Sequence, residues 1–263
     1  MPKASAFIGT SGFFYKHWQG VFYPETLPQK DWFGYYVRHF DTVELNVSFY
    51  RLPKKTTFEN WRAKAGKKFV FAVKGSHYIT HIKRLKDCQE PLARFFEAAS
   101  GLHSRSGPRG LSGSEVVLWQ LPPRFKANIS RLGEFLRLLV TVPTSLKLRG
   151  ARWRHAVEFR NKSWLSTEIY NLLRQYNAAI VFQDFADWPI TEEATADFVY
   201  LRFHGRTRLY SSCYTERELG TWAEKIKSWQ KQGLDVYVYF NNDALGYAVE
   251  NAKTLKKLCL EKS

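Results

Sequence analysis

Four segments of the chain alternate bulky apolar residues with residues that become charged or amide-bearing toward the end of each segment. They are TVELNVSFY (42–50), HAVEFR (155–160), FVYLRFHG (198–205) and DVYVYFNND (235–243). A period of two is typical of β-strands, whose successive side chains point to opposite faces. The pattern therefore places Glu44 and Asn46 on one face of a strand and Val43 on the other. If such strands share a sheet, their polar faces converge on one site.

Eight strands are predicted from apolar runs rich in Val, Phe, Tyr and Ile that end near Gly, Pro, Asn or Asp. Their expected bounds are Ala6–Thr10, Thr42–Phe49, Phe69–Gly75, Glu115–Leu121, His155–Arg160, Ala179–Phe185, Phe198–His204 and Val236–Asn241.

Helical patterns lie between most of these strands. They span Asp31–Phe40, Thr57–Ala65, Pro91–Ala99, Ile129–Val140, Ser166–Tyr176, Thr215–Gln232 and Gly246–Leu260. The sixth begins with Thr215 followed by Glu218, a capping box, and Gly233 ends it. Alternating strands and helices favour parallel pairing. Over 263 residues, eight such units predict an α/β fold, a TIM-type (β/α)8 barrel that forms a single domain over residues 1–263.

Several classes of protein are disfavoured by the sequence. Gly9, Gly12 and Gly20 follow the first strand at the wrong spacing for a dinucleotide-binding fingerprint. The three cysteines are far apart and form no CxxC pair, which is typical of reduced thiols and not of a disulfide or zinc framework. No apolar stretch reaches the roughly 20 residues needed to cross a bilayer, and no signal peptide opens the chain. We therefore expect a cytoplasmic protein with no membrane partner.

The net charge of +16 is unevenly distributed. Residues 51–154 hold 22 basic and six acidic side chains, whereas the chain on either side is balanced. Such a segment either forms a basic face that attracts phosphate, nucleic acid or other polyanions, or is an ordinary solvated surface.

Seven sequence blocks resemble the YecE-like family, also called domain of unknown function 72. They are GTSGFFYKHWQGVFYP (9–24), FDTVELNVSFYRLP (40–53), FAVK with ITHIKRL (71–85), LWQLPPRF (118–125), AVEFRNKSW (156–164), YLRFHG (200–205) and YVYFNND (237–243). They span nearly the whole chain in order. The resemblance implies a barrel fold and a site built from these blocks, but no established substrate.

Glu44 and Glu158 are the predicted acid/base residues, and His204 is the predicted catalytic histidine at a strand end. Two carboxylates that face one cavity can be driven to different pKa values by burial and neighbouring cations. The sequence does not give the distance between the two carboxylates. They are therefore equally compatible with a glycosidase-like pair, a metal-binding pair and a pair that forms salt bridges.

Further polar side chains on the same expected faces are predicted to bind substrate. Cationic members suit a phosphate or carboxylate, and aromatic members suit a sugar or base. The predicted set is Asn46, Lys74, His81, Gln120, Arg160, Arg202, Asn241, Trp18 and Tyr50. On the sixth strand, Gln183 and Asp184 are both candidates. For Trp18 and Tyr50, packing is the alternative, and for Tyr50 the core is slightly favoured.

The alternative to a ligand site is an internal lattice of ion pairs, in which Glu44 or Glu158 neutralises Arg160 or Arg202. His77 and His81 are spaced to share a metal, but no HExxH pattern accompanies them, so no metal ligand is predicted. The identity of a cofactor and the oligomeric state are left open.

Three functions follow from these observations. The first is a hydrolase or phosphoesterase-like enzyme that acts by acid/base chemistry on a small anionic, phosphorylated or nucleic-acid-derived substrate at the carboxyl ends of the strands. The alternative is non-catalytic binding of nucleic acid or another polyanion through the basic face. A structural or regulatory barrel with a relict site is the third.

Overall fold

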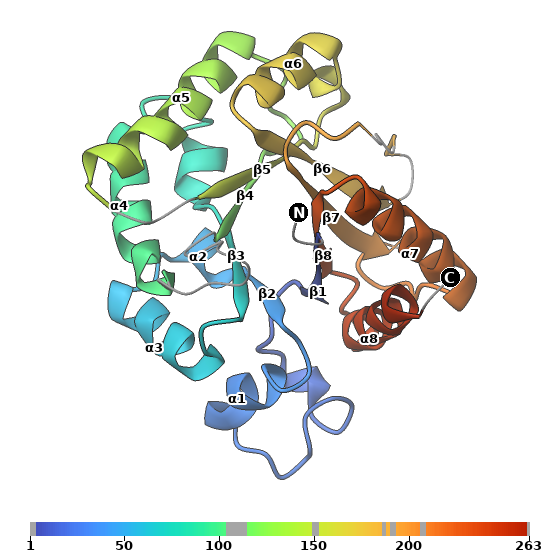
Figure 1. Ribbon diagram of the computed structural model, residues 1–263. Helices are drawn as coiled ribbons and strands as arrows, with labels where there is room; N and C mark the ends of the chain where they lie inside the picture. Colours follow the sequence, from blue (N-terminus) through green and yellow to red (C-terminus); the bar gives the residue numbers. More distant parts are fainter. Residues whose placement is uncertain are drawn as a thin grey trace. The chain divides into compact units, whose positions relative to one another are not determined.

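The structure, a computed structural model, describes residues 4–103, 115–148, 153–185, 188–189, 193–205 and 209–261. Within these ranges, eight strands alternate with helices along the chain (Figure 1). The strands are β1 (Ala6–Thr10), β2 (Thr42–Leu45), β3 (Val70–Lys74), β4 (Val116–Gln120), β5 (Arg154–Glu158), β6 (Ala178–Phe185), β7 (Phe198–Gly205) and β8 (Asp235–Phe240). All eight predicted strands are therefore present.

The α-helices also follow the predicted order. They are α1 (Trp32–Tyr36), α2 (Val47–Tyr50), α3 (Lys55–Ala65), α4 (Gln89–Ala99), α5 (Ile129–Ser145), α6 (Thr167–Gln175), α7 (Glu216–Lys231) and α8 (Tyr247–Leu260). Short 3-10 turns lie at Lys16–Trp18, Gln29–Asp31, Ser100–Leu102 and Lys162–Trp164, and a π-helical turn spans Tyr78–Ile82. The capping box of Thr215 and Glu218 is confirmed at the start of α7.

The strands are ordered β1-β8-β7-β6-β5-β4-β3-β2 in one sheet. Each neighbouring pair from β3 to β8, and the pair of β8 and β1, is parallel. A parallel bridge also joins Ser11, just after β1, to Glu44 in β2. Because all these strands run the same way, their carboxyl ends lie at a common edge of the sheet.

The second strand was predicted too long. It ends at Leu45, and a helical turn begins at Val47. Ser48 explains the turn, since its hydroxyl donates to the carbonyl of Leu45 at 3.3 Å and to that of Lys74 at 2.7 Å. Asn46 therefore does not continue the strand alternation of Glu44.

Two other predicted strand residues lie just beyond their strands. Arg160 follows β5, which ends at Glu158, and Asn241 follows β8, which ends at Phe240. Both lie at the carboxyl end, where loops and not strands position the side chains. Helix α5 extends past the predicted Val140 to Ser145 and includes Pro143.

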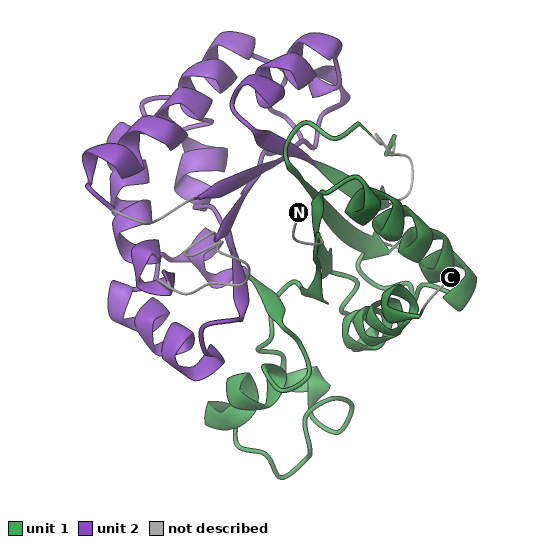
Figure 2. Ribbon diagram, viewed as in Figure 1, with its two compact units in different colours: residues 1–44, 181–263 green, residues 45–180 purple. Residues whose placement is uncertain are grey.

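The chain groups into two compact units, coloured separately in Figure 2. Unit 1 comprises residues 1–44 and 181–263, and unit 2 comprises residues 45–180. In unit 1, α7 and α8 pack beside β7, β8 and β1. In unit 2, α3 to α6 accompany β3, β4 and β5. The prediction that the whole chain forms one domain stays a prediction.

Candidate functional site

One face of the sheet in unit 1 becomes more polar along the direction of its strands. Near the amino ends, Phe7 stacks on Tyr237 with ring centroids 5.1 Å apart. Further along, Thr42 Oγ1 and the hydroxyl of Tyr239 are hydrogen-bonded at 2.7 Å. Charged side chains follow at the carboxyl ends, which is where parallel α/β folds bind their ligands.

Ser11, Glu44, Tyr200 and Arg202 form a buried cluster at this end. Arg202 Nη2 donates to Glu44 Oε1 at 2.8 Å and to Ser11 Oγ at 3.1 Å. Glu44 also accepts a hydrogen bond from the hydroxyl of Tyr200 at 2.7 Å and another from the hydroxyl of Ser11. Each of the four residues is at most 2% exposed. Buried charges need such partners, because losing one leaves an uncompensated charge in a medium of low polarity.

Tyr200 acts in this cluster as a hydrogen-bond donor. Burial, and then the neighbouring carboxylate of Glu44, raise the pKa of the Tyr200 hydroxyl well above its ordinary value. The hydroxyl therefore keeps its proton at physiological pH, and Glu44 stays fully hydrogen-bonded on both oxygens.

His204 lies two residues beyond Arg202 on β7 and therefore shares its face of the strand. Its Nδ1 lies 3.2 Å from Nδ2 of Asn241. The imidazole is buried against the rings of Phe185 and Tyr210, whose centroids lie 5.8 and 5.6 Å away. The structure thus brings two predicted site residues, His204 and Asn241, into contact.

The sixth strand places its two candidates on different faces. Asp184 Oδ2 accepts a hydrogen bond from Trp222 Nε1 of α7 at 3.2 Å, so Asp184 points to the helices. Gln183 points to the opposite face and is the register neighbour of Arg202. Of the two candidates, Gln183 alone shares the face of the charged cluster.

A second polar group in unit 1, His17 with Asp243, was not predicted. His17 Nε2 lies 3.0 Å from Asp243 Oδ2 and 2.8 Å from the Asp243 carbonyl oxygen. Trp18 Nε1 donates to Asp243 Oδ1 at 2.6 Å. Burial raises the pKa of Asp243 to about 6, although the bonds from Trp18 and His17 favour its charged form. The two residues occur in the motifs HW and NND, but a sequence separation of 226 residues hides their pairing.

The hydroxyl of Tyr15 donates to the backbone carbonyl of Ser11 at 2.6 Å. The ring of Tyr15 lies 5.4 Å from the ring of His17 and 5.0 Å from that of Trp18. Tyr15 therefore lies against both the buried cluster and the His17–Asp243 pair.

Trp18 was predicted to contact a ligand, but its side chain is fully buried. Its ring packs against Phe22 and Tyr23, with centroids 5.6 and 5.8 Å away. Its N–H is engaged by Asp243. The Trp18 ring is therefore packed among the aromatic side chains of unit 1, and its N–H is bonded to the Asp243 carboxylate.

In unit 2, Glu158 forms an ion pair with Arg160. The Nε and Nη2 atoms of Arg160 donate to Glu158 Oε1. The Glu158 side chain is fully buried, whereas that of Arg160 is 9% exposed. Gln120 is the register neighbour of Glu158 on β4. These three predicted residues are therefore brought together.

A cationic and aromatic cluster follows β2 and β3 in unit 2. Lys74 Nζ lies 4.2 Å from the ring centroid of Phe49, a cation–π distance. The rings of His77 and His81 stack at 4.7 Å, and each lies 5.1 Å from Phe49. Burial, with the nearby charges of His77 and Lys74, lowers the pKa of His81 to about 4, so His81 is neutral at physiological pH. Tyr50 is 82% exposed, and the expectation that it belongs to the core is wrong.

The backbone after this cluster is unusual. The π-helical turn Tyr78–Ile82 precedes three non-glycine residues with positive φ, which are Arg84 at 47°, Leu85 at 67° and Asp87 at 50°. Such conformations are maintained only where the surroundings over-determine them, and both features are frequent at functional sites. Both features lie in the loop that follows the carboxyl end of β3.

Among the described residues, no group of three His, Cys, Asp or Glu side chains is arranged to hold a metal. In the same residues, no helix is long and apolar enough to cross a membrane. Glu44 belongs to unit 1 and Glu158 to unit 2. A joint role of the two carboxylates stays a prediction, as does each assigned site residue.

Eight parallel strands alternating with helices, with polar side chains at their carboxyl ends, define a TIM-type (β/α)8-barrel protein. The chain matches the family model described as "Protein of unknown function DUF72" over residues 7–263. It belongs to this family, as its sequence blocks indicated.

Three relatives show how closely the chain follows the family. It is 26% identical to the UPF0759 protein YunF of Bacillus subtilis over 96% of this chain and 94% of the relative. It is 26% identical to the UPF0759 protein YecE of Escherichia coli over 84% and 82%. A crystal structure of a DUF72 family protein from Thermotoga maritima is 30% identical and superposes with a TM-score of 0.80, covering 98% of this chain and all of that one. The names of these relatives support the family and the fold and state no activity.

Proposed function

We propose that this protein is an enzyme that performs acid/base chemistry on an anionic substrate. The observation that carries the proposal is the convergence of Ser11, Glu44, Tyr200 and Arg202, from or just after three strands, at the carboxyl ends in unit 1. Apolar side chains would pack this position at least as well, because burying an ion pair is costly. A charged layer at the end of the sheet used for catalysis therefore favours a chemical role over a structural one.

In this proposal, Glu44 is a positioning residue. Both of its oxygens accept hydrogen bonds from Ser11, Tyr200 and Arg202, so it orients the guanidinium and the serine hydroxyl. Glu158 has the same role toward Arg160 in unit 2.

Proton transfer is assigned to the histidines of unit 1. The His17 side chain is 42% exposed and is held through Nε2 by Asp243, whose side chain is 12% exposed. A carboxylate that fixes one imidazole nitrogen leaves the other available to exchange a proton with a bound molecule. His204, held by Asn241, is the second candidate, although its ring is buried.

Unit 2, taken by itself, carries cations at the carboxyl ends of its strands that support anion binding within that unit. Lys74 ends β3, Arg160 follows β5, and His81 lies in the loop after β3. Lysine and arginine are the side chains best suited to phosphate and carboxylate groups. Phosphorylated and carboxylated metabolites are therefore the substrates to test first.

The proposal is tested by incubating the purified protein with a fractionated metabolite extract and following every mass by chromatography and mass spectrometry. We expect at least one phosphorylated or carboxylated metabolite to be consumed. His17→Gln should slow its consumption about 100-fold or more, since general acid/base groups contribute factors of this size. His39→Gln is the matched control, because His39 is an exposed histidine of the same unit. Absence of turnover by the wild-type protein, or equal rates for His17→Gln and wild type, would contradict the proposal.

Polyanion binding is a second candidate, and it is favoured by the charge of unit 2. Residues 45–180 contain 25 basic and eight acidic side chains, whereas unit 1 contains 15 and 16. If this surface binds nucleic acid, affinity for a single-stranded oligonucleotide should fall steeply with salt, because each phosphate contact releases counterions.

The matched variants for that experiment are two triple substitutions of exposed lysines. Replacing Lys64, Lys67 and Lys68 by Glu in unit 2 should abolish binding, and replacing Lys231, Lys253 and Lys257 in unit 1 should not. An affinity that does not change with salt concentration would contradict a basic interface on unit 2. Equal losses of oligonucleotide affinity in the two triple variants would contradict it as well.

A further inference from the structure

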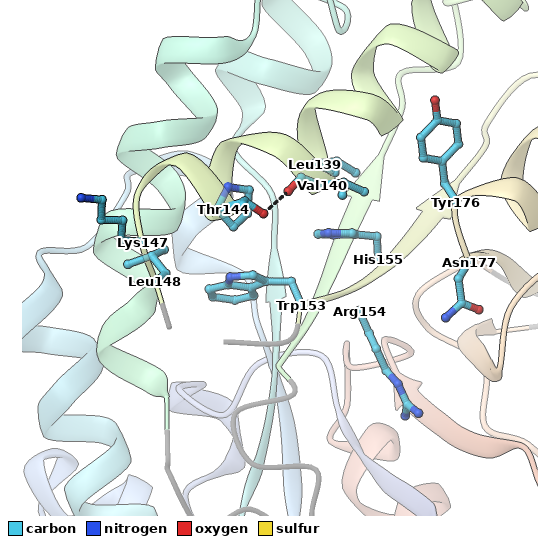
Figure 3. A pocket seen from close by; sticks show the side chains of 11 residues that line it. Leu139, Val140, Thr144, Lys147, Leu148, Trp153, Arg154, His155, Tyr176 and Asn177 are labelled. Atoms are coloured by element: carbon cyan, nitrogen blue, oxygen red, sulfur yellow. Dashed lines mark hydrogen bonds between the residues drawn. The ribbon is translucent and has the colours of Figure 1, made fainter. Parts of the chain in front are cut away.

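Two histidines of unit 2 differ in how their ring nitrogens are hydrogen-bonded. His155 lines a cavity of about 400 Å³ at the amino end of β5 (Figure 3). Its ring donates to the carbonyl of Leu139, and its Nδ1 accepts from Trp119 Nε1 at 3.3 Å. Both nitrogens of His155 are therefore occupied within the fold. His81, in the π-helical turn Tyr78–Ile82 after β3, is bonded through one nitrogen only among the described residues.

The imidazole of His81 is held in place by two neighbouring rings. It stacks on the ring of His77, with centroids 4.7 Å apart and 21° between the planes. The ring of Phe49 lies 5.1 Å away at 84°. His81 is half-buried in this cluster, and Phe49 is buried. Because the ring is packed in this way, its hydrogen bonding depends on which nitrogen carries the proton.

The hydrogen bonds of Thr80 decide the position of that proton. Thr80 Oγ1 donates to the carbonyl oxygen of Ser76 at 3.1 Å and lies 2.9 Å from His81 Nδ1. A hydroxyl has a single hydrogen, so toward His81 the Thr80 oxygen accepts and the Nδ1–H group donates. Burial is the main cause that lowers the pKa of His81 to about 4, so the ring is neutral at physiological pH. A neutral imidazole carries one proton, and Nε2 therefore has a lone pair.

Nε2 of His81 is open to solvent. Within the described part of the chain it has no hydrogen-bond partner, and it is not one of the buried side-chain atoms that lack one. The lone pair is therefore presented to water or to a bound molecule at the carboxyl end of β3. A nitrogen in this state accepts a hydrogen bond from a hydroxyl or an N–H group.

The surroundings of His81 are positively charged. Lys74 ends β3, and its Nζ lies 4.2 Å from the centroid of the Phe49 ring, which also contacts His81. The charges of Lys74 and Arg84 both disfavour a proton on His81, which means that they produce a positive potential at its ring. Residues 75–86 carry three lysine or arginine side chains and no aspartate or glutamate. A negatively charged group is therefore attracted to the space beside Nε2.

We propose that the carboxyl end of β3 binds a small hydroxylated anion, whose hydroxyl donates to His81 Nε2 and whose phosphate or carboxylate group faces Lys74 and Arg84. The inference rests on the anion binding proposed for unit 2 and adds what distinguishes one anion from another. An anion without the hydroxyl covers Nε2 from water but supplies no donor, and it therefore binds more weakly. Thr80 is the positioning residue that keeps the proton of His81 on Nδ1.

The test is a calorimetric titration of the full-length protein with two pairs of anions that differ only in their hydroxyl groups. Glycerol 3-phosphate is compared with propyl phosphate, and lactate is compared with propionate. We expect the hydroxylated member of at least one pair to bind with a millimolar or lower Kd and about tenfold more tightly than its partner, which is the contribution of one hydrogen bond. Equal affinities within both pairs would overturn this inference and leave anion binding in place. Absence of binding by all four anions would overturn both.

Substitutions at His81 locate the contact with the hydroxyl. His81→Phe keeps an aromatic ring beside His77 but has no acceptor, so it should remove the preference for the hydroxylated anion. His81→Gln places an amide oxygen near the position of Nε2 and should keep part of that preference. His39→Phe, at an exposed histidine of unit 1, is the control and should leave the preference unchanged. An unaltered preference in His81→Phe would overturn the inference.

Nitrogen NMR tests the position of the proton directly. Long-range proton–nitrogen correlations of the isotope-labelled protein should show His81 with its proton on Nδ1. Thr80→Val is nearly isosteric, removes the acceptor of that proton and should let the proton move to Nε2. The preference for hydroxylated anions should then fall about tenfold. A wild-type His81 that is protonated on Nε2 would overturn the inference, whether or not any of the variants folds.

Discussion

The two units of this chain differ in net charge, although each buries an ion pair. Unit 1 is almost neutral, with 15 basic and 16 acidic side chains, yet it buries Arg202 against Glu44. Unit 2 has 25 basic and eight acidic side chains, which is the origin of the net charge of the whole chain. The net charge of a region therefore does not reveal where its buried charges lie, because buried charges occur as matched pairs.

The largest expected difference between the two units is in the free energy of unfolding that is lost when an ion pair is broken, and it concerns the buried pair of unit 1. Glu44→Gln removes the buried carboxylate that accepts from the Arg202 guanidinium and should lower the free energy of unfolding by about 3–5 kcal/mol. Glu134→Gln in unit 2 breaks an exposed pair with Arg137 and should cost less than about 1 kcal/mol. Urea unfolding measures both. Equal losses in the two variants would contradict the distinction between buried and exposed charge.

A second difference lies in the response of unit 2 to acid. His155 is neutral in the folded protein with a pKa of about 3, but in the unfolded chain it takes up a proton below pH 6.5. The free energy of unfolding should therefore fall as the pH is lowered from 7 to 4.5, by about 3 kcal/mol from this residue. His155→Gln keeps a donor and an acceptor and should lose this pH dependence. The same slope in wild type and variant would refute the buried, neutral state of His155.

Close packing against glycine can be compared in the two units. A Cβ atom at Gly75 in unit 2 would lie 2.3 Å from the Trp119 ring, and one at Gly9 in unit 1 would lie 2.4 Å from the Thr42 carbonyl oxygen. Alanine at either position should cost about 1–3 kcal/mol by overpacking. We expect Gly9→Ala to lower the free energy of unfolding more than Gly75→Ala does, because a backbone oxygen can move away less easily than a side chain can. Gly34→Ala, with nothing within 4 Å, is the control.

The smallest expected effect is a change in the free energy of unfolding with pH that arises from Asp243 in unit 1. Its sign is opposite to that of the effect expected from His155. Burial raises the pKa of Asp243 from 3.8 to about 6, so between these values the folded state holds a proton that the unfolded chain has lost. The contribution of Asp243 to stability should fall as the pH rises from 4.5 to 6, by about 1–2 kcal/mol. Asp243→Asn should remove this dependence, and Asp41→Asn, an exposed aspartate, should not. A contribution that rises over the same range would contradict the assignment.

The sequence by itself determined the order of the strands and helices. Apolar runs rich in Val, Phe, Tyr and Ile identified all eight strands, and Thr215 with Glu218 marked the start of α7, because these signals depend on neighbouring residues. The family blocks added the class of fold. The same local signals failed at Asn46, where the side chain of Ser48 ends β2 by bonding to backbone carbonyls, one of them 26 residues away.

Only the tertiary structure decided which polar groups meet. Glu44 and Arg202 are 158 residues apart, and His17 and Asp243 are 226 apart, so no local pattern encodes either contact. The sequence placed Glu44 and Arg202 on polar faces, but it gave no reason to pair His17 with Asp243. Strand alternation assigns a side chain to a face, whereas the register of neighbouring strands and the course of the loops decide what that side chain touches.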